Sequence, residues 1–173
     1  MDELAGIILA AGEGSRMKSR TPKVLHCLCG KELLRFPVEL LGKLGMTRIV
    51  VVVSPANREA IKGLLGDTVE YTVQEARTGT AGAVESAASM LQGQFEQVVV
   101  IGGDAPLVAE DSVRRLIDGH IQDSRQMSIL SGIVQVNQGL GRISRDLGSQ
   151  QNVLGIVEAN DDTGRTGEPI EIN

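Results

Sequence analysis

Four short segments with the character of strands recur along the chain, three of them almost purely aliphatic, and each is followed by a segment with the character of a helix. Such aliphatic runs, bounded by turn residues, are typical of strands buried on both faces. The predicted strands are residues 5–10, 48–53, 69–73 and 97–101, and the predicted helices are residues 32–44, 57–65, 80–91 and 111–121. We expect Asn57 to be the N-cap of its helix and Gly45 to end the first one. The alternation predicts an α/β fold with a mostly parallel sheet and helices on both faces.

The pattern weakens in the last third of the chain. Residues 127–136, 142–144 and 153–157 are predicted as strands, residues 161–168 as a polar loop, and residues 171–173 as the beginning of another strand. No internal repeat or linker is visible, and 173 residues suit one domain. We therefore expect a single domain that is incomplete at its C-terminal end.

Composition excludes several classes of function. The chain has one Tyr, two Phe, no Trp and a net charge of −5, which disfavours a protein that stacks bases or grips a nucleic-acid backbone. No apolar run reaches the roughly 20 residues of a membrane span, and the N-terminus lacks the basic region of a signal peptide. Cys27 and Cys29 are too close for an ordinary disulfide and wrongly spaced for a zinc ribbon, so we expect reduced thiols in a cytoplasmic protein.

Residues 9–23 form a glycine-containing loop directly after the first predicted strand. Small residues let the backbone approach a ligand closely, and successive N–H groups of such a loop bind anions. Arg16 and Lys23 add positive charge at the same place, which suits a triphosphate. The loop lacks the Gly-Lys-Ser/Thr of a Walker loop, and Met17 replaces the third glycine of the dinucleotide fingerprint. The alternative is a tight connection between strand and helix.

Three further side chains stand next to predicted strand ends or helix starts. Gln74 follows the third strand, and its amide offers the donor and the acceptor that read a pyrimidine edge. Thr80 lies at a helix N-terminus, where it either contacts a ligand or only caps the helix. Asp104 follows the fourth strand, where ligands of open α/β sheets bind; it either holds Mg²⁺ against phosphates or only caps a turn.

Residues 9–17, Leu-Ala-Ala-Gly-Glu-Gly-Ser-Arg-Met, with Pro-Lys-Val-Leu-His at residues 22–26, resemble the signature of the UDP-N-acetylglucosamine pyrophosphorylases. Among these, the chain is similar to the N-terminal domain of the bacterial bifunctional enzymes that also acetylate glucosamine-1-phosphate. The resemblance implies a Rossmann-like nucleotide-diphospho-sugar transferase fold. It also implies Mg²⁺-dependent transfer of UMP from UTP to N-acetylglucosamine-1-phosphate, giving pyrophosphate and UDP-N-acetylglucosamine, a precursor of peptidoglycan and lipopolysaccharide.

The resemblance also implies roles for individual residues. Lys23 would neutralise the α-phosphate, Arg16 would steady the departing pyrophosphate, and Asp104 would hold Mg²⁺. The implied substrate-binding residues are Leu9, Ala10, Ala11, Gly12, Gly14, Gln74, Gly79, Thr80, Gly141, Glu158 and Asn173. Arg77 and Gly102 depart from the family, which often has Gln and Tyr at these positions. No general base is required, because the attacking phosphate oxygen is already ionised.

Several expectations concern what the chain lacks. The acetyltransferase β-helix and a second Mg²⁺ ligand, an Asn, belong to later segments of the family, which trimerises through the missing part. We therefore expect a monomer that cannot acetylate. Two alternatives stay open: a nucleotidyltransferase for another sugar phosphate or a cofactor precursor, and a nucleotide-binding fragment without turnover. His26 and His120 are expected in packing or solvent, since no Ser or Cys pairs with them in triad order.

Overall fold

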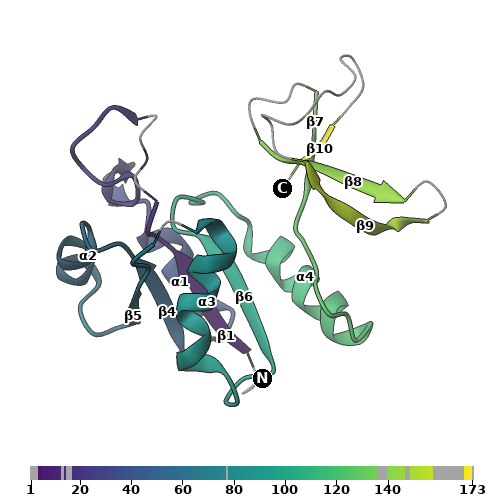
Figure 1. The fold of residues 1–173 in the computed structure, drawn as a ribbon, viewed down its shortest axis with the longest axis horizontal. Helices are drawn as coiled ribbons and strands as arrows, with labels where there is room; N and C mark the ends of the chain where they lie inside the picture. Colours follow the sequence, from purple (N-terminus) through teal and green to yellow (C-terminus); the bar gives the residue numbers. More distant parts are fainter. Residues whose placement is uncertain are drawn as a thin grey trace. The chain divides into compact units, whose positions relative to one another are not determined.

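The computed structural model describes residues 4–12, 14, 17–76, 78–135, 140–146, 149–157 and 170–172. The chain divides into two compact units, residues 1–110 and 111–173, which are described separately below (Figure 1). The expectation of one incomplete domain stays a prediction. None of the helices in the described ranges is both long and apolar enough to cross a membrane.

Unit 1 is built on a four-stranded parallel sheet with the order β5-β4-β1-β6. Its strands are β1 (Leu4–Leu9), β4 (Ile49–Val53), β5 (Glu70–Val73) and β6 (Gln97–Gly102). Every residue of β4 is buried, as its unbroken aliphatic sequence requires. The four predicted strands and their parallel pairing are confirmed.

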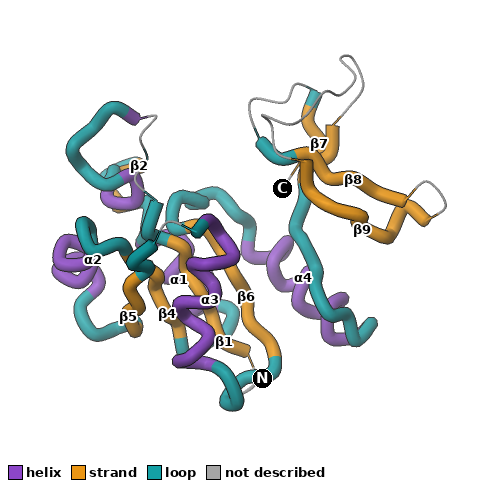
Figure 2. Tube along the Cα trace, viewed as in Figure 1, coloured by secondary structure: helices purple, strands orange, loops and turns teal. Residues whose placement is uncertain are grey.

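Helices cover both faces of this sheet (Figures 1 and 2). They are α1 (Arg35–Lys43), α2 (Arg58–Leu65) and α3 (Gly79–Leu91). Ala5 and Ile7 of β1 share a buried core with Ala83 and Ala87 of α3. Gly6 points to the other face because side chains alternate along a strand. There it meets α1 so closely that an added Cβ would lie 2.6 Å from Leu41 Cδ1.

The predicted first helix begins later than expected. Before it the chain forms a 3₁₀ turn, η2 (Lys23–Leu25), and a hairpin of β2 (Cys27–Leu28) and β3 (Lys31–Glu32). Cys29 and Gly30 join the two strands with φ of 52° and 82°, the two positive φ angles of a type I′ turn. The prediction of helix from Glu32 was therefore wrong for its first turn. Both cysteines are exposed free thiols.

Unit 2 contains α4 (Glu110–Gln122), which confirms the fourth predicted helix, and a second sheet. The strands are β7 (Gly132–Val134), β8 (Arg142–Asp146), β9 (Ser149–Val157) and β10 (Ile170–Ile172), in the antiparallel order β7-β10-β8-β9. The predicted strand 127–136 began too early, because residues 127–131 are not strand; β7 covers residues 132–134, which pair with β10, and residue 136 falls outside the described residues. The predicted loop 161–168 falls outside the described residues.

Candidate nucleotide-binding site

The carboxyl ends of β1 and β6 lie side by side, and the candidate site is built on them. Leu9 is opposite Gly102 in the parallel register, and the N–H of Gly103 donates to the carbonyl of Leu9 at 2.9 Å. The loop after β1 and the turn after β6 therefore leave the sheet from adjacent positions. This is the edge at which open α/β sheets bind ligands.

Lys23 and Asp104 meet across these two strand ends. Lys23 Nζ forms an ion pair with Asp104 Oδ2, although the residues are far apart in sequence. The side chains are 41% and 35% exposed, so both charges remain accessible to a ligand. An ion pair this exposed contributes little to stability, which leaves the two groups available for other partners.

Gly14 packs against the aliphatic part of Lys23. Its φ is +61°, and an added Cβ would lie 2.6 Å from Lys23 Cβ. Both the backbone conformation and the close approach require glycine here. Gly14 therefore lies against the lysine, and the structure brings two of the predicted site residues into contact.

The two glycines before Asp104 have close neighbours, which are backbone and core side chains at Gly103 and the movable carboxylate of Asp104 at Gly102. A Cβ on Gly103 would lie 3.0 Å from Leu34 Cδ1 and 3.0 Å from the carbonyl oxygen of Leu9. A Cβ on Gly102 would lie 2.9 Å from Asp104 Oδ1. Sequence reasoning found the aspartate but missed these packing constraints.

The segment that carries Lys23 is held by a buried side chain and a backbone hydrogen bond. Val24 is 4% exposed, and its carbonyl accepts from the N–H of Leu34 at 3.0 Å. These contacts fix η2 against the residues that lead into α1.

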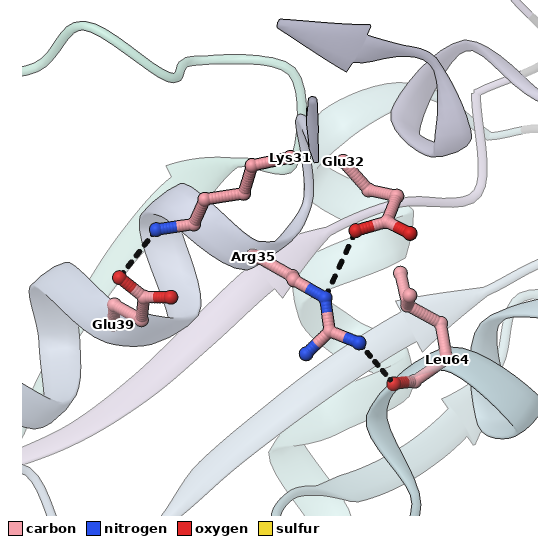
Figure 3. A network of polar contacts seen from close by, with 5 residues as sticks. All are labelled: Lys31, Glu32, Arg35, Glu39 and Leu64. Carbon is pink, nitrogen blue, oxygen red and sulfur yellow. Dashed lines mark hydrogen bonds and ion pairs between the residues drawn. The ribbon is translucent and has the colours of Figure 1, made fainter. Parts of the chain in front are cut away.

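Charged side chains hold the neighbouring hairpin to α1 (Figure 3). Arg35 donates to Glu32 at 2.9 Å and to the carbonyl of Leu64 at 3.0 Å, while Lys31 pairs with Glu39. The pKa of Glu32 is lowered because its carboxylate is hydrogen-bonded to its own backbone N–H and to Arg35. The hairpin, α1 and the end of α2 thus form one support for the lysine segment.

Gln74 follows β5, further along the same edge of the sheet. Its backbone N–H donates to the carbonyl of Val53 at 2.9 Å, and its side-chain Nε2 donates to the carbonyl of Gly79 at 3.1 Å. Gly79 begins α3, and Thr78 takes the N-cap position. The alternative that Thr80 only caps the helix was therefore wrong: Thr80 lies in the first turn, where backbone N–H groups lack helical partners.

A hollow of about 300 Å³ opens beside Gln74. It is lined by residues 73–76 and Thr78 before α3, and by Gly82, Glu85 and Ser86 of α3. Gly82 is required there, because an added Cβ would collide with the hydroxyl of Thr78 at 1.7 Å. The hollow is next to the predicted base-reading amide.

The remaining predicted residues divide into three groups. Leu9, Ala10, Ala11 and Gly12 lie at the end of β1, and Gly12 is exposed with open space where a side chain would be. Gly141 is buried in unit 2, directly before β8. The residues outside the described part of the chain are Arg16, Arg77, Glu158 and Asn173.

Among the described residues of unit 2 is a charged cluster that sequence reasoning did not predict. Glu171 of β10 accepts from Arg145 of β8 at 2.6 Å and from the hydroxyl of Ser131 at 2.5 Å. These bonds, from Arg145 first and Ser131 second, lower the pKa of Glu171 to about 2. Since the three residues are far apart in sequence, no local signal could have found them.

Asp104 suits a magnesium ion whose remaining coordination positions are filled by water and by the phosphates of a bound substrate. Mg²⁺ keeps several waters and is commonly held by one or two carboxylates together with substrate phosphates. Within the described ranges, no group of three or more His, Cys, Asp and Glu side chains could hold a metal without a substrate. His26 and His120 are hydrogen-bonded, to the carbonyl of Thr21 at 3.2 Å and to the hydroxyl of Ser128 at 2.9 Å.

Comparison with known proteins agrees with this geometry. The chain is 40% identical over its whole length to a bifunctional protein GlmU of Caldanaerobacter subterraneus subsp. tengcongensis, and 38% identical to that of Thermoanaerobacter pseudethanolicus. In both cases it spans 37% of the relative's length. The crystal structure of Rv0371c from Mycobacterium tuberculosis H37Rv shares the fold, with a TM-score of 0.58 and 24% identity over 67% of this chain and 59% of that one. Residues 6–138 match the MobA-like NTP transferase domain, and the chain belongs to that family.

Proposed function

We propose that this chain transfers UMP from UTP to N-acetylglucosamine-1-phosphate, forming UDP-N-acetylglucosamine and pyrophosphate. The observation that carries the proposal is the accessible pair of Lys23 and Asp104 between the ends of β1 and β6. Membership in an NTP transferase family supports nucleotidyl transfer, and the GlmU relatives support a sugar nucleotide as the product. Because the chain spans 37% of their length, the substrates and the rate are part of the proposal. The product would supply cell-envelope synthesis from the cytoplasm.

The reaction requires alignment and charge compensation more than proton transfer. The attacking phosphate oxygen is ionised at neutral pH, so no general base is needed. Lys23 would turn from Asp104 to the α-phosphate and stabilise the charge that develops during in-line attack. The backbone of residues 9–14 and the guanidinium of Arg16 would bind the departing pyrophosphate.

Asp104 is the residue that would hold Mg²⁺. The ion would neutralise phosphate charge and orient the triphosphate for attack. Release of Lys23 from the carboxylate would then make the lysine available for the nucleotide. Gln74 would read the uracil edge, with Gly79 and Thr80 beside it, and Gly141, Glu158 and Asn173 would contact the sugar.

Substitution of Lys23 tests the proposal. We expect Lys23→Ala to reduce the rate of pyrophosphate release by about a hundredfold or more, while the affinity for the sugar phosphate changes little, because the lysine acts on the transition state. Lys62→Ala is the matched control, since Lys62 is an exposed lysine of α2 outside the candidate site. An unchanged rate of pyrophosphate release in Lys23→Ala would exclude the assigned role.

Substrate panels separate the proposal from its alternatives. Pyrophosphate release is measured with UTP, CTP, GTP and ATP against several sugar-1-phosphates and a cofactor precursor phosphate. UTP with N-acetylglucosamine-1-phosphate should give the highest kcat/KM. A higher value for another pair would identify a related nucleotidyltransferase. Binding of UTP without any release of pyrophosphate would identify a nucleotide-binding fragment.

A further inference from the structure

Asn57 is a buried polar residue whose position is not explained by its own helix. It is 4% exposed, and within the described residues it is the one polar side chain that is buried to this degree. It occupies the N-cap position of α2, as the sequence predicts, but its side chain makes no capping hydrogen bond. Its φ and ψ of −114° and −3° also differ from the extended conformation usual at an N-cap. The amide group therefore has another purpose.

The side chain of Asn57 connects α2 to the end of β1. Its Oδ1 accepts from the N–H of Ser54 at 2.9 Å, which fixes the orientation of the amide. Its Nδ2 then donates to the carbonyl oxygen of Ala10 at 2.8 Å, across 47 positions of sequence. Both ends of the amide are used, as a buried amide requires.

Ala10 is consequently held through both of its backbone groups. Its N–H donates to the carbonyl of Val52 at 2.8 Å, and its carbonyl accepts from Asn57. The preceding carbonyl, that of Leu9, accepts from Gly103 at 2.9 Å. The peptide group between Leu9 and Ala10 is thus fixed from opposite sides of β1, and Asn57 fixes the next one.

Fixing the carbonyl of Ala10 also fixes the N–H of Ala11. In a trans peptide the C=O and the following N–H point in opposite directions, and the described peptides are all trans. The N–H of Ala11 therefore points away from Asn57, and it has no hydrogen-bond partner among the described residues. Gly12 follows with open space on its Cβ side. These are the first donors of the proposed nucleotide loop.

We infer that Asn57 is a positioning residue for nucleotide binding: through the carbonyl of Ala10 it aims the N–H of Ala11, at the start of the loop, at the nucleotide. The inference rests on the proposed function. It assigns Asn57 no contact with the substrate, because the side chain is buried and both ends of its amide are occupied. Its effect is on the affinity for the nucleotide and not on the affinity for the sugar phosphate.

Asn57→Leu is the principal test, since leucine has the same number and branching of side-chain heavy atoms, adds no charge and removes both hydrogen bonds. We expect the Kd for UTP, measured by calorimetry on the whole chain, to rise about tenfold, as for the loss of one well-aligned hydrogen bond to a charged ligand. Asn57→Asp retains the acceptor for Ser54 but sets an oxygen against the carbonyl of Ala10, so it should weaken UTP at least as much. The Kd for N-acetylglucosamine-1-phosphate should change less than about twofold in both variants.

Two controls separate positioning from loss of stability. Ile61→Val trims a fully buried side chain of the same helix without touching Ala10, and it should leave the Kd for UTP unchanged. In NMR spectra, Asn57→Leu should shift the amide resonances of Ala11 and Gly12 more than that of Ile7 within β1. Unchanged UTP binding by Asn57→Leu, or equal weakening by Ile61→Val, would overturn the inference while leaving the proposed function intact. Wild-type chain that binds neither UTP nor UDP-N-acetylglucosamine would overturn both.

Discussion

Replacing Glu171 by glutamine should loosen the second sheet, because its carboxylate connects β10 to β8 and to the residue before β7. It accepts hydrogen bonds from Arg145 of β8 and from Ser131, which lies directly before β7. The side chains of Glu171 and Arg145 are 22% and 32% exposed, so solvent screens the pair only in part. Glutamine keeps the size of the side chain and removes its charge.

The size of the effect follows from the pKa of Glu171. Arg145, then Ser131, lower this pKa from 4.5 to about 2, against a smaller opposing effect of burial. Each unit of difference between the folded and unfolded pKa corresponds to about 1.4 kcal/mol, which gives an upper limit of about 3 kcal/mol at neutral pH. Allowing for solvent screening, we expect about 2 kcal/mol.

The pH dependence has a definite sign. The folded pKa is lower than the unfolded one, so the stabilisation is fully present well above pH 4.5 and is lost as the pH falls from about 4.5 toward 2. Wild type and Glu171→Gln should therefore differ most near pH 7 and converge in acid. A constant difference between the two would show that the charge of Glu171 is not responsible.

Amide hydrogen exchange in β7 and β8 is the suitable assay, because Phe36, Tyr71 and Phe95 all lie in unit 1 and do not report on unit 2. At pH 7 the exchange of these amides in Glu171→Gln should be about thirtyfold faster than in wild type at the same pH. Glu59→Gln is the control, since the side chain of Glu59 is 88% exposed. Equal exchange rates in wild type and Glu171→Gln at pH 7 would refute the reasoning.

Three glycine substitutions give further expectations. Gly6→Ala places a methyl group 2.6 Å from Leu41 Cδ1 and should lower the free energy of unfolding by about 1–3 kcal/mol in urea titrations. Gly42→Ala, in α1 with open space around it, should raise the free energy of unfolding by roughly 0.5–1 kcal/mol, and a loss there would contradict the packing argument. Gly102→Ala should displace the carboxylate of Asp104 from its ion pair with Lys23. The affinity for Mn²⁺ without nucleotide, measured by electron paramagnetic resonance, should then rise by up to about fivefold. An unchanged Mn²⁺ affinity would argue against competition within that ion pair.

The parallel sheet was predictable because its two central strands, β1 and β4, are buried on both faces, whereas the edge strand β6 exposes Val98 and Val100. A strand such as β4, Ile-Val-Val-Val-Val, has no polar position, and this composition distinguishes it from a surface strand. The antiparallel sheet of unit 2 was less predictable, because its strands β7 and β9 expose apolar side chains such as Ile133 and Leu154 and so lack a clean alternation of apolar and polar residues. The β2–β3 hairpin was missed because its two-residue strands are too short to show an alternating pattern.

The candidate site was also predictable only in part. Lys23 and Asp104 were predictable as neighbours, because both follow strands whose carboxyl ends share one edge of the sheet. Asn57 was predicted as a helix cap, a local role, whereas its hydrogen bond to Ala10 depends on how β1 and α2 pack. A contact between residues distant in sequence has no local pattern, so sequence reasoning finds the residue and misses its partner.

The division into two units gives the proposed function a further consequence. Lys23, Gln74 and Asp104 all belong to unit 1, whereas Gly141 belongs to unit 2. If unit 1 binds the nucleotide and unit 2 contributes to binding the sugar, then Glu171→Gln should raise the KM for the sugar phosphate and leave the Kd for UTP unchanged. Asn57→Leu should instead raise the Kd for UTP and leave the KM for the sugar phosphate unchanged. Substitutions in different units that make no common contact should also add in free energy when combined. The free-energy change of the double variant is calculated from its kcat/KM. A value that differs from the sum of the two single changes would show that the two units act together during turnover.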